Sequence, residues 1–110
     1  MKVFRQGDVL VRQVRHRTPT GKDVREGGRI ILAHGEVTGH AHEVLEERCL
    51  DFDTPAAQFF EEPDGQRFLF VHRACVLTHQ EHGPVSLAPG CYEVVRQREY
   101  APDEIRDVAD

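Results

Sequence analysis

Two pairs of histidines are the residues whose types and spacing could do chemistry in this chain. His40 and His42 are two positions apart, and His79 and His82 form a second pair later in the chain. Side chains at i and i+2 of a strand point to the same face, so an extended segment would bring the first two imidazoles to one point. Neutral imidazole is the commonest protein metal ligand. The pattern therefore predicts a divalent metal site built from histidines.

Carboxylates near the two pairs could complete the ligand set. Glu46 has the same strand parity as the first histidine pair, whereas Glu43 would point to the opposite face. Glu81 lies within the second pair and is another oxygen donor. Four neutral donors would suit tetrahedral zinc in a closed, stabilising site, and three would leave a position for water or substrate. The sequence does not choose between a structural site and an enzyme.

The segments that must position these residues are predicted to be short strands. Residues 9–14 alternate along the chain, and residues 29–34 form an apolar, β-branched run. Residues 38–45 could be a strand or the start of a helix, and Gly35 and Gly39 favour the strand. Residues 57–62 are expected to pair with residues 67–72 across a turn that contains Pro63 and Gly65.

Later segments repeat the same pattern of strands and turns. Residues 75–78, 85–87 and 91–97 are β-like, and residues 79–84 are expected to form a turn or bulge. Many short strands separated by turns predict an all-β fold, a small barrel or jelly roll that is one domain over residues 1–110. Ile105 and Val108 have i, i+3 spacing, so residues 102–109 could add one short C-terminal helix.

Composition narrows the class of protein. The chain has 110 residues and a formal net charge of −5, which argues against wholesale binding to nucleic-acid backbones. Three cysteines without a CxxC spacing predict reduced thiols rather than a disulfide framework. No apolar run has the length of a signal peptide core or a membrane span. We therefore expect a cytoplasmic protein that does not enter the membrane.

Two alternative functions fit the same sequence. One is an interaction module without metal, such as a phage or accessory protein, which assembles with copies of itself through sheet edges. The other is an anion-binding or RNA-binding edge formed by a basic stretch. That stretch comprises Arg12, Arg15, His16, Arg17, Lys22 and Arg25, with Arg96 and Arg98 late in the chain. A catalytic cysteine is not favoured, because Cys75 lies in an apolar strand and free cysteines are usually buried small hydrophobes.

The first histidine pair lies in a segment that resembles the first metal motif of the cupins. In that motif a glycine precedes an HxH pair and a glutamate follows it, and His40, His42 and Glu46 occupy these ligand positions. The resemblance implies a small β-barrel that holds iron, manganese, nickel or zinc. In this chain a proline–glycine turn follows the second histidine pair instead of preceding it, so the resemblance does not assign the fourth ligand.

A second resemblance covers nearly the whole chain. Its motifs are residues 5–10 (RQGDVL), 35–44 (GEVTGHAHEV) and 79–100 (HQEHGPVSLAPGCYEVVRQREY). As a set they look like a family of small uncharacterised bacterial and phage proteins. This resemblance implies kinship with that family and supplies no activity.

Overall fold

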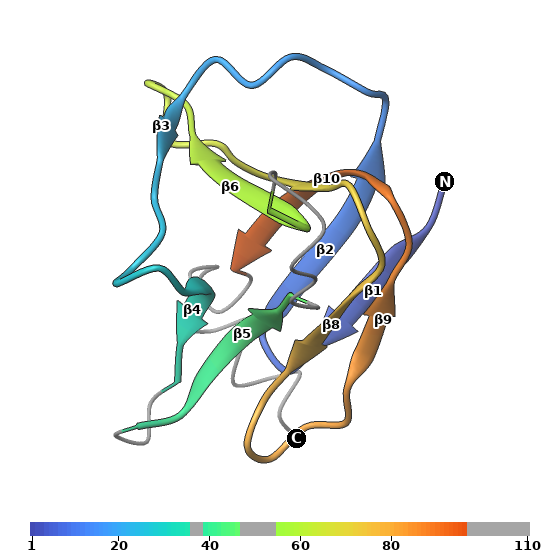
Figure 1. Ribbon diagram of the computed structural model, residues 1–110. Coiled ribbons are helices and arrows are strands. Elements are labelled where there is room, and N and C mark those ends of the chain that lie inside the picture. Colours follow the sequence, from blue (N-terminus) through green and yellow to red (C-terminus); the bar gives the residue numbers. More distant parts are fainter. Residues whose placement is uncertain (36–38, 47–54, 97–110) are drawn as a thin grey trace, which may run out of the picture.

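The chain folds as an all-β protein, as the alternating sequence predicts. The structure is a computed structural model that describes residues 1–35, 39–46 and 55–96 (Figure 1). Its strands are β1 (Val3–Gln6), β2 (Val9–Val14), β3 (Lys22–Asp23), β4 (Ile30–His34), β5 (Ala41–Leu45), β6 (Ala57–Glu61), β7 (Arg67–Val71), β8 (Cys75–Thr78), β9 (Val85–Leu87) and β10 (Gly90–Arg96). The helix predicted over residues 102–109 lies outside the described residues.

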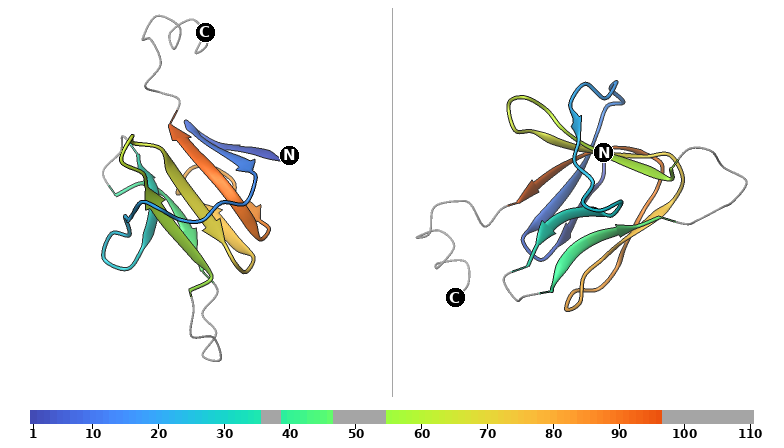
Figure 2. Two further views of the ribbon diagram at one scale, coloured as in Figure 1. Left: turned by 90° about the horizontal axis from the view of Figure 1, so that it is seen from above. Right: turned by 60° about the vertical axis from the view of Figure 1, so that its left-hand side comes forward.

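The strands form two antiparallel sheets. One has the order β1-β2-β10-β7-β6-β3, and the other has the order β4-β5-β8-β9. In the left view of Figure 2, β4 and β5 lie on one side while β10, β2 and β1 lie on the other. Over the described ranges, the chain contains no helix long and apolar enough to cross a membrane.

The core lies between the sheets because strands such as β2, β7 and β10 turn alternate apolar side chains inward. Val11 of β2, Leu69 of β7 and Tyr92 of β10 join Leu32 of β4 and Leu77 of β8 in one cluster, and all five are almost fully buried. The hydroxyl of Tyr92 donates a hydrogen bond to a backbone carbonyl at 2.6 Å, so this polar atom is satisfied. The core therefore draws on both sheets.

The outer face of the larger sheet carries a second apolar cluster. Phe68, Phe70 and Cys91 are buried there, while the alternate residues of β7 face the main core. The guanidinium of Arg17 lies 4.1 Å above the ring of Phe68 and covers part of this surface. Strand β7 is therefore buried on both of its faces.

The predicted strands around the histidines are also found. Residues 9–14 form β2, and the favoured strand rather than the helix is observed in β5. Strands β6 and β7 pair as predicted, with Phe59 opposite Leu69. Gly65 in the connecting turn has a φ of +91°, a conformation that glycine adopts readily.

Replacing Leu77 with alanine should lower the free energy of unfolding by about 2–5 kcal/mol, because it leaves a cavity between the sheets. Leu77 is 0% exposed, whereas Leu45 is 51% exposed and provides a matched control. Leu45→Ala should change the free energy of unfolding by less than about 1 kcal/mol. Denaturant unfolding measures both variants, and equal losses would contradict the assignment of Leu77 to the core.

Candidate metal centre

The structure brings the two predicted histidine pairs together. His40 and His42 lie at the start of β5, while His79 and His82 lie in the loop between β8 and β9. Both places are at the lower edge of the view in Figure 1. His42 has the same strand parity as Val44, a core residue, and therefore points inward. Segments far apart in sequence thus contribute imidazoles to one cluster.

The four rings form a chain of close contacts. The centroid of the His79 ring lies 4.3 Å from that of His42, 4.7 Å from that of His82 and 5.8 Å from that of His40. The rings of His42 and His82 are nearly parallel, with centroids 6.0 Å apart. We call these four residues the histidine cluster. Its base is His42, which is 2% exposed, and its mouth is His82, which is exposed.

A tight turn between β1 and β2 closes one side of the histidine cluster. Gly7 and Asp8 form a two-residue hairpin loop, and Gly7 has a φ of +60°. A Cβ atom on Gly7 would lie 2.6 Å from Nε2 of His82 and 3.2 Å from Cε1 of His42. The turn therefore lies directly against two rings, and a larger residue at this position would displace them.

Gln6, next to this turn, fixes the orientation of His42. The buried Gln6 amide donates to the carbonyl oxygens of Leu77 at 3.0 Å and Gly83 at 2.9 Å. Because carbonyl oxygens only accept hydrogen bonds, Nε2 of Gln6 must face them and Oε1 must face His42. Nδ1 of His42 lies 2.9 Å from that oxygen, so it carries the proton and donates. In the neutral ring, Nε2 is then the free acceptor.

Asp8 faces this free nitrogen. Its Oδ1 lies 3.3 Å from Nε2 of His42, and its Oδ2 accepts a hydrogen bond from Arg96 at 3.0 Å. Burial alone would raise the pKa of Asp8, but the hydrogen bond and charge of Arg96 outweigh it and hold the pKa below its ordinary value. Asp8 is therefore an ionised carboxylate beside the base of the histidine cluster.

Two of the imidazoles, those of His42 and His79, favour the neutral form. Burial and then the neighbouring His79 lower the pKa of His42 to about 4, although the carboxylate of Asp8 partly opposes this shift. The pKa of His79 is lowered by burial and then by its neighbours His82 and His40. Neutral imidazole is the form that binds metals, since a protonated ring has no free lone pair.

Two members of the histidine cluster have informative polar contacts. Nδ1 of His40 is buried without a hydrogen-bond partner among the described residues, and it lies 3.6 Å from a carboxylate oxygen of Glu81. Nδ1 of His79 accepts a hydrogen bond from the backbone N–H of Glu81 at 3.0 Å. His79 must give up this bond or turn its ring before that nitrogen can bind an ion.

The rings pack against one another in tilted, edge-to-face and stacked arrangements. Within residues 1–35, 39–46 and 55–96, no three His, Cys, Asp or Glu side chains stand ready to hold a metal ion. The tilts between neighbouring rings, 36° and 44° for His79 with His42 and His82, reflect this packing. Coordination would require rotation of side chains, which the exposed mouth at His82 leaves room for.

Glu46, the carboxylate predicted to join the histidines, makes other contacts. Arg25 binds it with two hydrogen bonds of 2.7 and 2.9 Å, and the backbone N–H of Ala57 donates to it at 3.1 Å. This arginine lies in the segment between β3 and β4. The sequence of β5 by itself could not predict the contact. Glu43 points away from the cluster as predicted and pairs with Arg29.

The contacts of two cysteines and three arginines bear on the other functions considered from the sequence. Burial raises the pKa of Cys75 to about 11 and also raises the pKa of Cys91, so both described thiols stay protonated. Three arginines of the basic stretch pair with glutamates: Arg12 with Glu93, Arg17 with Glu62 and Arg25 with Glu46. Anion binding and assembly through sheet edges remain predictions.

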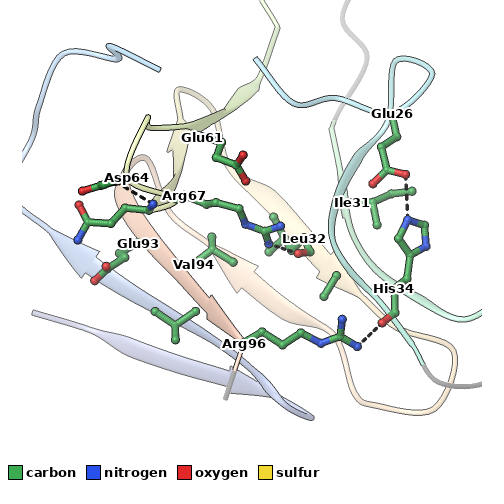
Figure 3. A pocket seen from close by; sticks show the side chains of 14 residues that line it. Glu26, Ile31, Leu32, His34, Glu61, Asp64, Arg67, Glu93, Val94 and Arg96 are labelled. Carbon is green, nitrogen blue, oxygen red and sulfur yellow. Dashed lines mark hydrogen bonds and ion pairs between the residues drawn. The ribbon is translucent and has the colours of Figure 1, made fainter. Parts of the chain in front are cut away.

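A separate cavity of about 620 Å³ lies between β4 and the β7–β10 part of the larger sheet (Figure 3). Arg67 and Arg96 extend along it and donate hydrogen bonds to the backbone carbonyls of Leu32 and His34. The guanidinium of Arg96 thus joins the edge strand β4 to Asp8. The cavity therefore adjoins the Arg96–Asp8 ion pair, whose carboxylate faces His42.

Sequence reasoning missed Gln6 and Asp8. Both belong to the motif at residues 5–10, which carries no metal-ligand spacing of its own. The available signal was Gly7 followed by Asp8 between two alternating segments, a hairpin pattern. Which strands that hairpin would meet depended on pairing across the whole chain.

The fold and this geometry define an all-β protein with a cluster of four histidines, of which His42 is buried. The chain belongs to the family described as domain of unknown function DUF8820, whose family model matches residues 5–97. That match includes the histidine cluster together with Gln6 and Asp8. No curated protein and no solved structure matches the chain. Kinship with an uncharacterised family is confirmed, and the resemblance to the cupins stays a prediction.

Replacing Gln6 with leucine should destabilise the protein by about 1–3 kcal/mol, because it leaves buried carbonyls and the His42 N–H without partners. Gln66→Leu, in the exposed β6–β7 turn, is a matched control that should change stability little. Thermal or denaturant unfolding compares the two. A Gln6 variant as stable as wild type would contradict the three hydrogen bonds assigned to this amide.

The pair Glu46–Arg25 should make stability depend on pH. Burial opposes ionisation of Glu46, but hydrogen bonds from Arg25 and the backbone lower its pKa below the ordinary value. This stabilisation, roughly 1–3 kcal/mol, is present above the pKa of the unfolded chain, about 4.3, and is lost as pH falls through the folded pKa.

Unfolding of Glu46→Gln and Arg25→Gln at pH 7 and pH 3 measures this dependence. Each variant should lose stability at pH 7 and differ less from wild type at pH 3. The double variant should lose less than the sum of the single losses, because the two side chains act as a pair. Strictly additive losses would contradict the pairing.

Proposed function

We propose that this protein binds a divalent metal ion through the histidine cluster. The observation that carries the proposal is the convergence of four imidazoles from two distant segments, with neighbouring centroids 4.3 to 5.8 Å apart. With metal–nitrogen distances of about 2.0–2.1 Å, two imidazoles on one tetrahedral ion have centroids roughly 5 Å apart. The spacing of the rings thus suits a shared ion after side-chain rotation.

The lowered pKa values of His42 and His79 keep lone pairs available for a metal ion. Burial and the neighbouring histidines oppose protonation of both rings, so these nitrogens need not lose a proton before they bind. The alternative is a metal-free stack of neutral rings. The buried Nδ1 of His40, which lacks a hydrogen-bond partner in the described part of the chain, favours the metal, since a stack alone leaves this atom unsatisfied.

The difference in exposure between the histidines is consistent with entry of an ion from solvent. His42 at the base is buried, whereas His82 at the mouth is exposed, so an ion could enter from solvent and first meet a movable ring. The cupin-like spacing of His40 and His42 is consistent with this use. Zinc, iron, manganese and nickel all fit a site rich in imidazole.

Isothermal titration of the untagged full chain with Zn²⁺, Ni²⁺ and Mn²⁺ tests the proposal. We expect one ion per chain for at least one of these metals. His42→Ala and His79→Ala should each weaken binding by about 100-fold or more, because even indirect supports of a metal ligand contribute 10–100-fold. His72→Ala is a matched control, since that exposed ring pairs with Gln58 outside the cluster.

Two results would contradict a metal site. One is the absence of stoichiometric binding for all three metals, with thermal stability unchanged by added metal or chelator. The other is equal loss of affinity in the His72 control and the cluster variants. Circular dichroism of each variant separates loss of binding from loss of fold.

A further inference from the structure

Two residues of the segment 6–8, Gln6 and Asp8, contact His42 but are not part of the histidine cluster. We propose that this turn is the second half of the metal site, with Asp8 as a carboxylate ligand and Gln6 as the residue that orients His42. The inference rests on the proposed function and specifies its ligand set. Asp8 would take the place of the predicted carboxylate Glu46, whose oxygens are bound by Arg25.

The first support is the direction in which His42 presents its lone pair. Oε1 of Gln6 accepts a hydrogen bond from the Nδ1–H of His42, and the amide nitrogen of Gln6 donates to the carbonyl oxygens of Leu77 and Gly83. Metal-binding histidines regularly donate their second nitrogen to an oxygen acceptor that fixes the ring in this way. Gln6 is such a positioning residue, and Nε2 is the nitrogen it leaves available.

The second support is what faces that nitrogen. Oδ1 of Asp8 lies 3.3 Å from Nε2 of His42, the nitrogen that the hydrogen bond to Gln6 leaves available, and the ring is 2% exposed. When a nitrogen and an oxygen bind one tetrahedral ion at about 2.0–2.2 Å each, they are roughly 3.3–3.6 Å apart. The observed separation matches this arrangement.

The third support is the close approach of the turn itself. Gly7 lies against His82 and His42, where a Cβ would be 2.6 Å from Nε2 of His82. The positive φ of Gly7 allows the tight hairpin that places Asp8 beside the rings. Arg96 then holds the second oxygen of Asp8, which leaves Oδ1 directed at the cluster.

Asp8→Asn tests the ligand role, with Asp64→Asn as a matched control. Both substitutions keep the shape of the side chain and remove its charge, but Asp64 lies in the exposed β6–β7 turn, where it accepts a hydrogen bond from the backbone N–H of Gln66. In titrations with Zn²⁺, Asp8→Asn should weaken binding at least about 10-fold, and Asp64→Asn should stay within about 3-fold of wild type. The loss in Asp8→Asn should be larger for Mn²⁺ than for Ni²⁺, because carboxylates suit the harder ion.

The outcomes separate this inference from the proposed function. If wild type binds metal and His42→Ala does not, but Asp8→Asn binds like wild type, Asp8 is no ligand and the histidine site stands. Equal losses in Asp8→Asn and Asp64→Asn would show that the loss does not depend on a carboxylate beside the cluster, and would overturn the inference. If wild type binds none of the metals, the proposed function itself fails.

Nuclear magnetic resonance of wild type avoids any folding defect in the variants. On addition of Zn²⁺, the ¹⁵N resonance of His42 Nε2 and the ¹³C resonance of the Asp8 carboxyl should both shift, while Nδ1 of His42 remains protonated. A shift at His42 without one at Asp8 would overturn the carboxylate ligand. A proton found on Nε2 of metal-free His42 would overturn the role of Gln6.

Discussion

One buried amide holds the candidate site together. Gln6, at the end of β1, donates hydrogen bonds to carbonyls in β8 and in the loop after it, and it accepts a hydrogen bond from His42 of the first histidine pair. These bonds join the β1–β2 turn, the start of β5 and the β8–β9 loop. A buried amide must satisfy its polar atoms, so its three partners are fixed together. The position of the histidine pairs and the tautomer of His42 follow from this constraint.

Around this amide, a buried histidine that resists protonation lies beside an ionised carboxylate. His42 is too buried and too close to other imidazoles to be protonated easily, while Arg96 keeps the nearby Asp8 ionised. The result is an anion beside acceptor nitrogens, with an exposed ring at the mouth. A bound cation would compensate the negative charge of Asp8 and use the free lone pairs of the imidazoles. This complementarity is the physical basis of the proposed metal site.

The sequence predicted what depends on local alternation. Strand β2 and the inward direction of His42 follow from side chains that repeat every two residues. The meeting of the two histidine pairs was a reasonable hypothesis on the same grounds. Glu46 shared their parity, but Arg25 from a distant loop binds it, and parity cannot reveal such a partner. Asp8 was missed because only strand pairing across the whole chain brings its hairpin to the rings, and the local sequence does not show that pairing.

X-ray absorption spectroscopy of the zinc-loaded full chain tests metal binding by the histidine cluster most directly. It should show a nitrogen and oxygen shell at about 2.0–2.1 Å with the outer-shell scattering of imidazole, and no sulfur at about 2.3 Å. The buried thiols of Cys75 and Cys91 form no part of the cluster. Zinc that is lost on desalting, or a bound ion without imidazole scattering, would contradict the proposed site.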